Sequence, residues 1–221
     1  MSLTQSSIIV LHLTKYGDSS MVVHTIDSTS GRCSYLLRGI GKNKKISQFH
    51  PLALLDIVSS FSPKSSLGFI KEYVPCASLD SLRSNLHKSS MALFISEVLY
   101  RSVCEQSSDE RLFNWLCTAI ETLENCDETL NFHLWFLVGF CTVLGFGPSS
   151  EGVFDGSEMF QPESLRVVRQ LSTLSFDEAM KIKLTGSRRS DFCEQIIHYL
   201  SFHLGVNLNI RSLDVLHELY L

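Results

Sequence analysis

The residues best suited to chemistry are four cations in the stretch RGIGKNKKIS: Arg38, Lys42, Lys44 and Lys45. No acidic residue falls between the first and the last of them, and two glycines share the same eight positions. Lysines and arginines grouped in this way suit phosphate groups, because such contacts depend on charge and not on base sequence. A solvated loop that aids solubility explains the composition equally well, so the stretch alone leaves both interpretations open.

Patterns for other chemistry are incomplete. GIGK lacks the GxxxxGK[ST] spacing of a phosphate loop and leads into a predicted strand instead of a helix. No two of the seven cysteines form a CxxC pair, and His198 and His203 fall on different helix faces. No GxSxG motif is present, and residues 147–158 are the weakest basis for a hydrolase. We therefore expect no enzyme activity, no catalytic residue, no cofactor and no metal ion.

Charge is distributed unevenly along the chain. Residues 1–75 hold eight Lys/Arg and four Asp/Glu, a net charge of +4, whereas residues 76–221 hold 11 and 19, a net charge of −8. An asymmetry of this kind indicates more about partners than the total of −4 does. It predicts that the N-terminal part meets a polyanion and that the acidic part stays away from it.

The first part of the chain reads as five short strands, at residues 7–13, 20–26, 33–39, 52–61 and 67–74. Turn residues separate them and no helical pattern intervenes, which predicts a five-stranded antiparallel barrel of the OB-fold type. Lys15 and Arg32 flank predicted turns, and we expect them to join the basic group. Tyr16, Tyr35 and Phe49 are candidates to stack on bases, although half-burial in the barrel is the more common role for each.

Beyond residue 76 the apolar period changes from two to 3.6 and predicts an all-α domain. Helices are expected at 78–103, where Ser78 with Asp80 or Ser81 offers a cap, and at 109–125. The nearly all-apolar segment 128–146 should be the central helix, and shorter helices should follow the loop at 147–158. The fold class is therefore α+β, with a barrel domain at 1–76 and a helical domain at 77–221.

Aromatic side chains of the helical part could also line a groove for a partner peptide. Trp115 and Trp135 are the candidates, with Arg101 and Arg111 as the nearest cations in sequence. Packing in the core explains most such aromatics equally well. No apolar run is long enough to span a bilayer, no signal peptide is evident, and the cysteines fit a reducing cytoplasm.

With this layout in place, the sequence resembles the RecO family of DNA repair and recombination mediators. The N-terminal resemblance lies in a first strand followed by KYGDS, the TIDSTSG hairpin, the LLRGI strand end and the lysine-rich loop. Further on it lies in ALFISEVLYRSV, in FLVGFCTVLGFGP and in the closing YLSFHLGVNLNIRSLDVLHEL. Together the pieces cover the chain from end to end.

The resemblance implies an oligonucleotide-binding barrel followed by a helical domain, in a bacterial, cytoplasmic and nucleoid-associated protein. It implies binding and annealing of single- and double-stranded DNA, and partners that include RecR and the C-terminal tail of the single-stranded DNA-binding protein. It also implies help in loading the recombinase on coated strands. Many members carry a four-cysteine zinc site after the GF-x-P motif, but GFGPSSEGVFDGSEMF holds no cysteine, so no zinc is expected here.

Two hypotheses follow. In the first, the chain is a non-catalytic DNA-binding mediator that neutralises phosphate charge on its basic surface. In the second, it is a protein-interaction adaptor whose helical domain binds a partner peptide, without direct DNA binding. Salt-dependent affinity for DNA separates the two, because only the first requires it.

Overall fold

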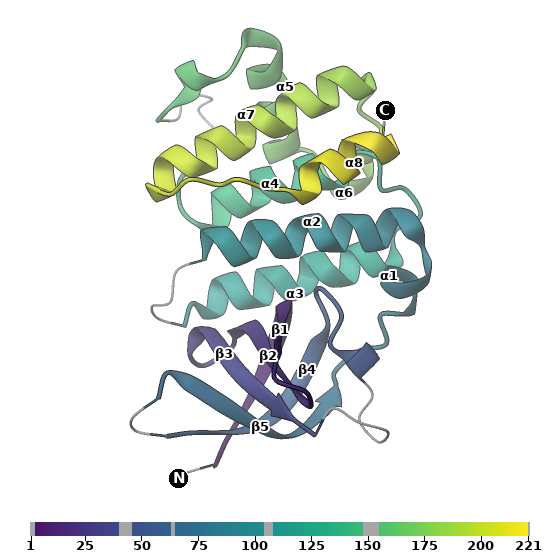
Figure 1. The fold of residues 1–221 in the computed structure, drawn as a ribbon. Coiled ribbons are helices and arrows are strands. Elements are labelled where there is room, and N and C mark those ends of the chain that lie inside the picture. The colour runs from purple at the N-terminus through teal and green to yellow at the C-terminus, as the bar shows by residue number, and fades with distance from the viewer. Residues whose placement is uncertain (1–2, 40–45, 63–64, 104–107, 148–154, 221) are drawn as a thin grey trace. The chain divides into compact units, whose positions relative to one another are not determined.

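The computed structural model describes residues 3–39, 46–62, 65–103, 108–147 and 155–220 of the chain (Figure 1). Lys42, Lys44 and Lys45 therefore lie outside the described residues. The chain divides into two compact units, Met1–Glu124 and Asn125–Leu221. The barrel ends at Pro75, and the division into a DNA-binding domain at 1–76 and a helical domain at 77–221 stays a prediction.

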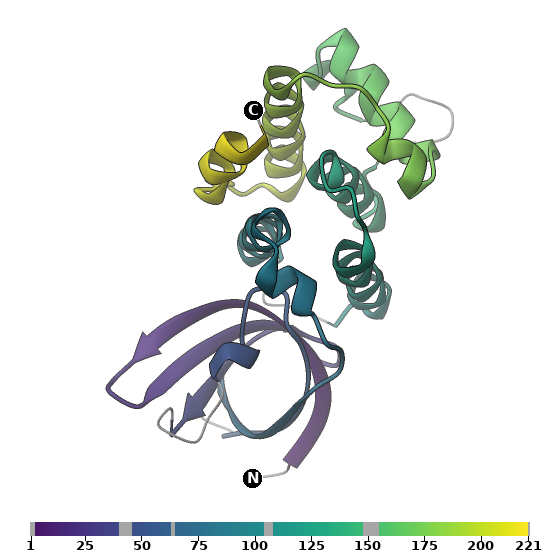
Figure 2. The same cartoon turned by 90° about the vertical axis from the view of Figure 1, so that its right-hand side faces the viewer.

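The N-terminal part of the first unit is a closed barrel, which Figure 2 shows almost end-on. Its strands are β1 (Leu3–Tyr16), β2 (Ser20–Asp27), β3 (Gly31–Arg38), β4 (Leu54–Phe61) and β5 (Leu67–Pro75). Their order around the barrel is β1-β2-β3-β5-β4. Four of the pairings are antiparallel, and the seam between β3 and β5 is parallel. The predicted five-stranded OB-type barrel is confirmed.

Alternation of apolar residues creates the barrel core. Successive side chains of a strand point to opposite faces, so every second residue enters the interior. The buried cluster comprises Ile8, Val10, Val23, Tyr35, Leu37, Phe49, Ala53, Leu55, Ile57 and Ile70. Phe49 comes from the linker before β4, which includes a short helical turn, η1 (Ile46–Gln48), and closes one end of the core.

One buried carboxylate ties three strands and a turn together. Asp27, at the end of β2, is 1% exposed. Its Oδ2 accepts hydrogen bonds of 2.6 Å from the hydroxyl groups of Ser6 on β1 and Tyr35 on β3. Its Oδ1 accepts the hydroxyl and amide of Thr29 and the amide of Ser30 in the β2–β3 turn. Gly31 completes the turn at φ 68°, as the sequence predicts.

Among its described residues the first unit also has three α-helices: α1 (Asp80–Ser84), α2 (Leu86–Ser102) and α3 (Glu110–Asn125). The expectation that Ser78 caps the first of them is wrong. The carboxylate of Glu124 on α3 accepts the amides of Ser81 and Leu82 at 2.8 Å, and no side-chain cap comes from the residue before α1. The predicted helix at 78–103 is broken where the Asn85 side chain caps α2.

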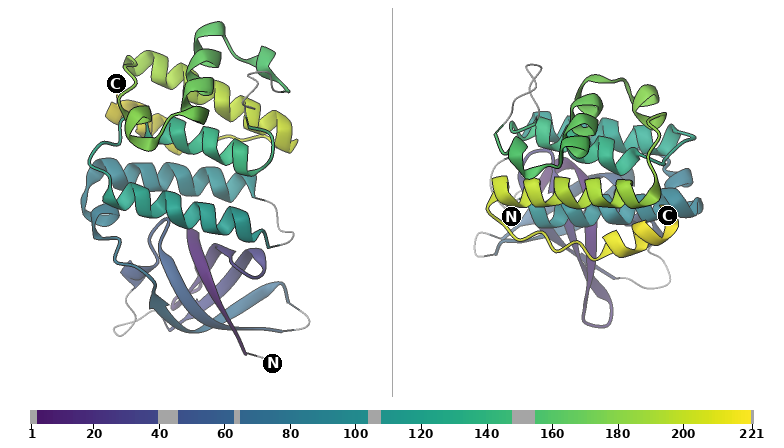
Figure 3. Two further views of the ribbon diagram at one scale, coloured as in Figure 1. Left: turned by 180° about the vertical axis from the view of Figure 1, so that it is seen from behind. Right: turned by 90° about the horizontal axis from the view of Figure 1, so that it is seen from above.

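The second unit consists of helices around a central one, which Figure 3 shows from behind and from above. They are α4 (Phe132–Val143), α5 (Pro162–Thr173), α6 (Phe176–Met180), α7 (Gly186–Leu204) and α8 (Ser212–Tyr220). α4 is buried nearly all round, as predicted for the central helix. Among the described helices of the chain, none is long and apolar enough to cross a bilayer.

A buried amide organises the second unit. Asn131, fully buried before α4, donates to the carbonyl oxygens of Ala179 and Ile182 at 3.1 and 2.9 Å. Its own oxygen accepts a 3.3 Å bond from Nε of buried Arg189, which also donates to the carbonyl of Leu184. The amide thus fixes the α6–α7 connection against the start of α4, and these bonds offset the burial of the polar groups.

Aromatic rings hold the described ends of the 147–158 loop. The ring of His203 stacks on Phe146 with centroids 4.9 Å apart and lies 4.4 Å from the ring of Tyr199. The Tyr199 hydroxyl donates to the carbonyl of Phe146, and the His203 ring meets the carbonyl of Asp155 at 3.3 Å. Ring packing and these hydrogen bonds therefore hold both described ends of the loop.

The Asp27 network generates a stability prediction. Asp27→Ala should destabilise the protein by about 3 kcal/mol, because it leaves the buried Tyr35 hydroxyl without its acceptor and frees the turn amides. Asp56→Ala is the matched control, since that exposed carboxylate on β4 accepts only a 2.6 Å bond from the Ser7 hydroxyl and a bond from the thiol of exposed Cys76 among the described residues. The control should cost less than about 1 kcal/mol in denaturant unfolding. Equal losses for the two variants would contradict the network's importance.

His133 on α4 generates a prediction about pH. Burial, with the nearby Arg189 and His217, lowers the pKa of His133 from 6.5 to about 3. The unfolded chain therefore binds a proton that the folded chain excludes, and stability falls as pH drops below about 6.5. Unfolding should cost about 2 kcal/mol less at pH 5 than at pH 7 through this group alone. In His133→Leu this loss should shrink by that amount, and an unchanged pH profile would rule the cause out.

Candidate nucleic-acid interface

The register of the barrel places the predicted cation Arg38 in one row with an exposed tyrosine. Tyr16 on β1 pairs with Ser20 on β2, which in turn pairs with Arg38 on β3. Residues directly opposite one another in a sheet project to the same face. Tyr16 is 59% exposed and Arg38 is also exposed. The row therefore presents an aromatic ring and a guanidinium on the outside of the barrel.

The parallel seam extends this surface to β5. Leu36 pairs with Phe69, so Phe69 and Lys71 share the outward face with Arg38. The guanidinium of Arg38 lies 4.8 Å from the centroid of the Phe69 ring, and Nζ of Lys71 lies 5.9 Å from the same ring. We call Tyr16, Ser20, Arg38, Phe69 and Lys71 the outer face. It combines the exposed cations and aromatic rings that single-strand binding requires.

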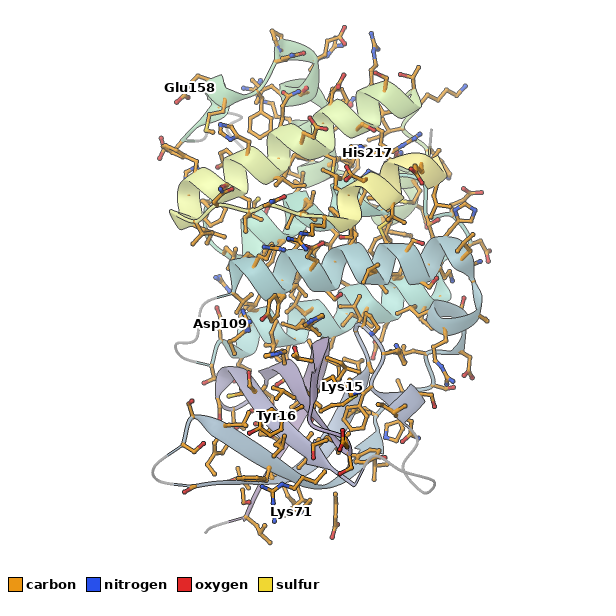
Figure 4. All side chains as sticks on the ribbon, in the orientation of Figure 1. Lys15, Tyr16, Lys71, Asp109, Glu158 and His217 are labelled. Carbon is orange, nitrogen blue, oxygen red and sulfur yellow. The ribbon has the colours of Figure 1, made fainter. Side chains whose placement is uncertain are left out.

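Figure 4 labels three residues of this region, Lys15, Tyr16 and Lys71, all on the barrel. Lys15 is exposed beside Tyr16, where the β1–β2 hairpin turns through Gly17 at φ 68°. The structure thus brings Lys15 to the same end of the barrel strands as Arg38. Gly39 follows with φ 71°, a backbone conformation that favours glycine.

Arg32 lies at the other end of β3 and has a different role. Arg38 is six positions further along the strand, a distance of about 20 Å. Its guanidinium covers the ring of Tyr100 on α2 at 4.1 Å and donates to the carbonyl groups of Tyr100 and Val103. A cation at these carbonyls stabilises the C-terminus of α2. The structure therefore does not bring Arg32 to the outer face.

A histidine cluster occupies the barrel surface next to Arg32. The rings of His12 and His24 are stacked 5.9 Å apart, and both lie within 5.5 Å of the Tyr100 ring. His24 also makes hydrogen bonds with Thr14 and Ser34. Helix α2 thus covers this end of the sheet, whereas Tyr16 and Arg38, at the other end, are exposed.

Two of the three aromatic candidates are buried. Tyr35 and Phe49 are each 1% exposed and belong to the barrel core. Burial and the hydrogen bond to Asp27 raise the pKa of Tyr35 well above its usual value, so its hydroxyl stays a donor inside the barrel. Tyr16 is left as the candidate with an accessible ring.

The residues proposed for a partner groove fall into both units. Arg101 on α2 forms an ion pair with Glu97 at 2.9 Å, and Arg111 is exposed on α3. Trp115 on α3 is half-buried. Trp135 belongs to the second unit, where its ring packs against Phe132 and Phe176. The first three thus lie on neighbouring helices of one unit, and Trp135 serves the packing of α4 on α6.

Phe69 and Lys71 are the site residues that sequence reasoning missed. Both stand in a predicted strand, and a lysine two residues after a phenylalanine is ordinary alternation. Their relation to Arg38 follows from the parallel β3–β5 pairing, which no local pattern reveals. The sequence offers one indication: Lys71 is a cation in the last predicted strand of the basic N-terminal segment.

The described residues show no grouping for a metal. No three His, Cys, Asp or Glu side chains among them are placed to share an ion. The segment 147–158 offers three acids to a hydrolase, of which Asp155 and Glu158 are described and Glu151 lies outside the described residues. The backbone carbonyl of Asp155 lies 3.3 Å from Nε2 of His203.

Comparison with known families decides the relationship. A model described as "Recombination protein O N terminal" matches residues 1–79, and one described as "Recombination protein O C terminal" matches residues 83–152. The chain belongs to the RecO family. This confirms the resemblance found in the sequence and gives the chain a role in DNA repair.

Curated RecO relatives match along the whole chain. A protein of Flavobacterium psychrophilum is 30% identical over 231 residues, which are 96% of this chain and 97% of the relative. A protein of Bacteroides fragilis is 30% identical over 235 residues, with the same coverage. A protein of Christiangramia forsetii is 26% identical over 237 residues, 99% of each chain. Each of the three is named "DNA repair protein RecO".

Arg32 offers a test that separates structure from binding in this RecO-family chain. Arg32→Ala should lower the free energy of unfolding by about 2 kcal/mol, because the α2 carbonyl groups lose charge-assisted bonds. Affinity of the folded variant for single-stranded DNA should change less than about twofold, since Arg32 lies away from the outer face. A stable variant that loses DNA affinity would place Arg32 in the interface instead.

Proposed function

We propose that this RecO-family chain is a non-catalytic, DNA-binding recombination mediator that holds single strands on the outer face. The observation that carries the proposal is the convergence of Arg38 and Lys71 on the Phe69 ring, with Tyr16 exposed in the adjoining row. Phosphates would pair with the two cations, and Tyr16 would stack on a base. The lysines at 42, 44 and 45, with Lys15, would extend the phosphate track.

Charge neutralisation gives this surface its mechanism. Two DNA strands repel each other through their phosphates, and bound cations lower the cost of bringing the strands together. On this basis the chain would bind single- and double-stranded DNA and anneal complementary strands. Because stacking is tolerant of sequence, binding would show little base preference.

Family membership supports the wider role. We propose that the chain acts with RecR and with the C-terminal tail of the single-stranded DNA-binding protein to help load the recombinase on coated strands. Arg101, Arg111, Trp115 and Trp135 stay candidates for partner contacts, and the cytoplasm and nucleoid are the proposed location. The competing proposal of a peptide-binding adaptor predicts tight partner binding with no salt-dependent affinity for DNA.

Single charge reversals test the outer face. Arg38→Glu and Lys71→Glu should each weaken binding of labelled oligothymidine about tenfold or more and lower the salt slope by about 0.7 per lost phosphate contact. Arg83→Glu is the matched control, an exposed arginine on α1 that pairs with Asp80 at 3.7 Å. The control should bind as the wild type does, as measured by fluorescence anisotropy at two salt concentrations.

Two further variants complete the design. Tyr16→Ala should cost about 1–3 kcal/mol of binding free energy without changing the salt slope, because stacking releases no counterions. Reversing the charges of Lys42, Lys44 and Lys45 together should remove most of the affinity of the protein for DNA. Wild-type binding in that triple variant and in Arg38→Glu would overturn the assignment of DNA to this surface.

A further inference from the structure

Cations are segregated within the second unit as well. Residues 125–221 hold seven Lys/Arg and twelve Asp/Glu, so the unit is acidic overall. Six of those seven cations fall between Arg166 and Arg189, a segment that includes only two acids, Asp177 and Glu178. We call the segment from Arg166 to Arg189 the basic island. It concentrates positive potential at one place on an acidic unit, and none of its residues belongs to the outer face of the barrel.

The island surrounds a hollow of about 260 Å³ between α5, the α6–α7 connection and α7. Its rim carries three exposed cations, Arg166 from α5, Lys183 from the connection and Arg188 from α7, together with the amide of Gln170. The hydrogen bond from Asn131 to the Ile182 carbonyl fixes the connection that presents Lys183. The three charges are therefore held around one concave surface by the packing of the unit.

One carboxylate shares the hollow with these cations. Glu163 pairs with Arg188 at 3.2 Å, and both side chains are more than half exposed. An exposed pair of this kind stabilises a protein by less than about 1 kcal/mol. An incoming phosphate can therefore compete with Glu163 for Arg188, and it meets Arg166 and Lys183 in the same hollow.

The lining favours a phosphate chain over an acidic-apolar peptide. A peptide with apolar anchors needs an open apolar floor. Here the apolar part of the lining is recessed: Val167 and Phe192 are 9% and 5% exposed, and Ile182 and Leu184 are half-buried. The exposed lining groups are the three cations, Gln170 and Glu163. Phosphodiester oxygens match such donors, because arginine and lysine contact phosphate without regard to sequence.

We propose that this hollow binds the backbone of a second DNA strand, independently of the strand held by the barrel. The inference rests on the proposed DNA-binding function and adds to it a second contact site on the helical unit. A protein that holds two strands at separate sites brings them to a high effective concentration, which is what pairing of complementary strands requires.

Energy transfer between two non-complementary strands tests the proposal on the full chain. Donor-labelled and acceptor-labelled oligothymidines are mixed with limiting protein, so that transfer reports two strands on one molecule. The double variant Arg166→Glu with Lys183→Glu should keep first-strand affinity within about twofold and lose most of the transfer. Lys181→Glu is the matched control, since Lys181 is exposed in the same segment but does not line the hollow.

Glu163→Gln is the second variant and should act in the opposite direction. It removes the competing carboxylate, so the affinity for the second strand should rise about two- to fivefold. A gain of this kind cannot come from misfolding, and thermal unfolding of the double variant checks its fold. No change in transfer for either variant would overturn the second site.

The outcomes distinguish the two levels of the proposal. If the wild type binds no oligothymidine, the proposed function itself fails. If it binds the first strand normally and transfer survives in the double variant, only the second site fails. A hexa-aspartyl-phenylalanine peptide that binds the wild type but not the double variant, with transfer unaffected, would show that the hollow is a peptide site.

Discussion

The buried carboxylate of Asp27 is the constraint on which the barrel depends. Its two oxygens accept hydrogen bonds from β1, from β3 and from the turn that joins β2 to β3. A slip of one residue in any of these strands would turn its side chains to the other face and separate the donors from the acceptor. The network therefore fixes the register that puts Tyr16, Ser20 and Arg38 in one row.

Two arginines on one strand show how that register divides structural and binding roles. Arg32, at the start of β3, is bound to the C-terminal carbonyl groups of α2 and covers Tyr100. Arg38, at the end of the same strand, is exposed and shares the Phe69 ring with Lys71. Helix α2 thus fixes one end of the sheet, whereas Tyr16 and Arg38 are exposed at the other end.

Local patterns in the sequence predict the barrel and most helices, because period-two and period-3.6 alternation and turn residues such as Gly31 are local properties. They do not predict contacts between segments far apart. The cap on α1 comes from Glu124, more than 40 residues away, and Phe69 meets Arg38 through a parallel seam. From the sequence alone Arg32 is a candidate DNA contact. Its packing against α2 involves a segment about 70 residues later, which no local pattern reveals. The lysines at 42, 44 and 45 stay a prediction from composition and family resemblance.

The salt dependence of DNA binding by the wild-type chain tests the central claim most directly. If the outer face and the adjoining lysines neutralise four to six phosphates, a plot of log affinity against log salt for an oligothymidine should have a slope of about −3 to −4. That slope, together with affinity that does not depend on base sequence, is the result the account predicts. Absence of measurable binding at low salt, or a slope near zero, would contradict it.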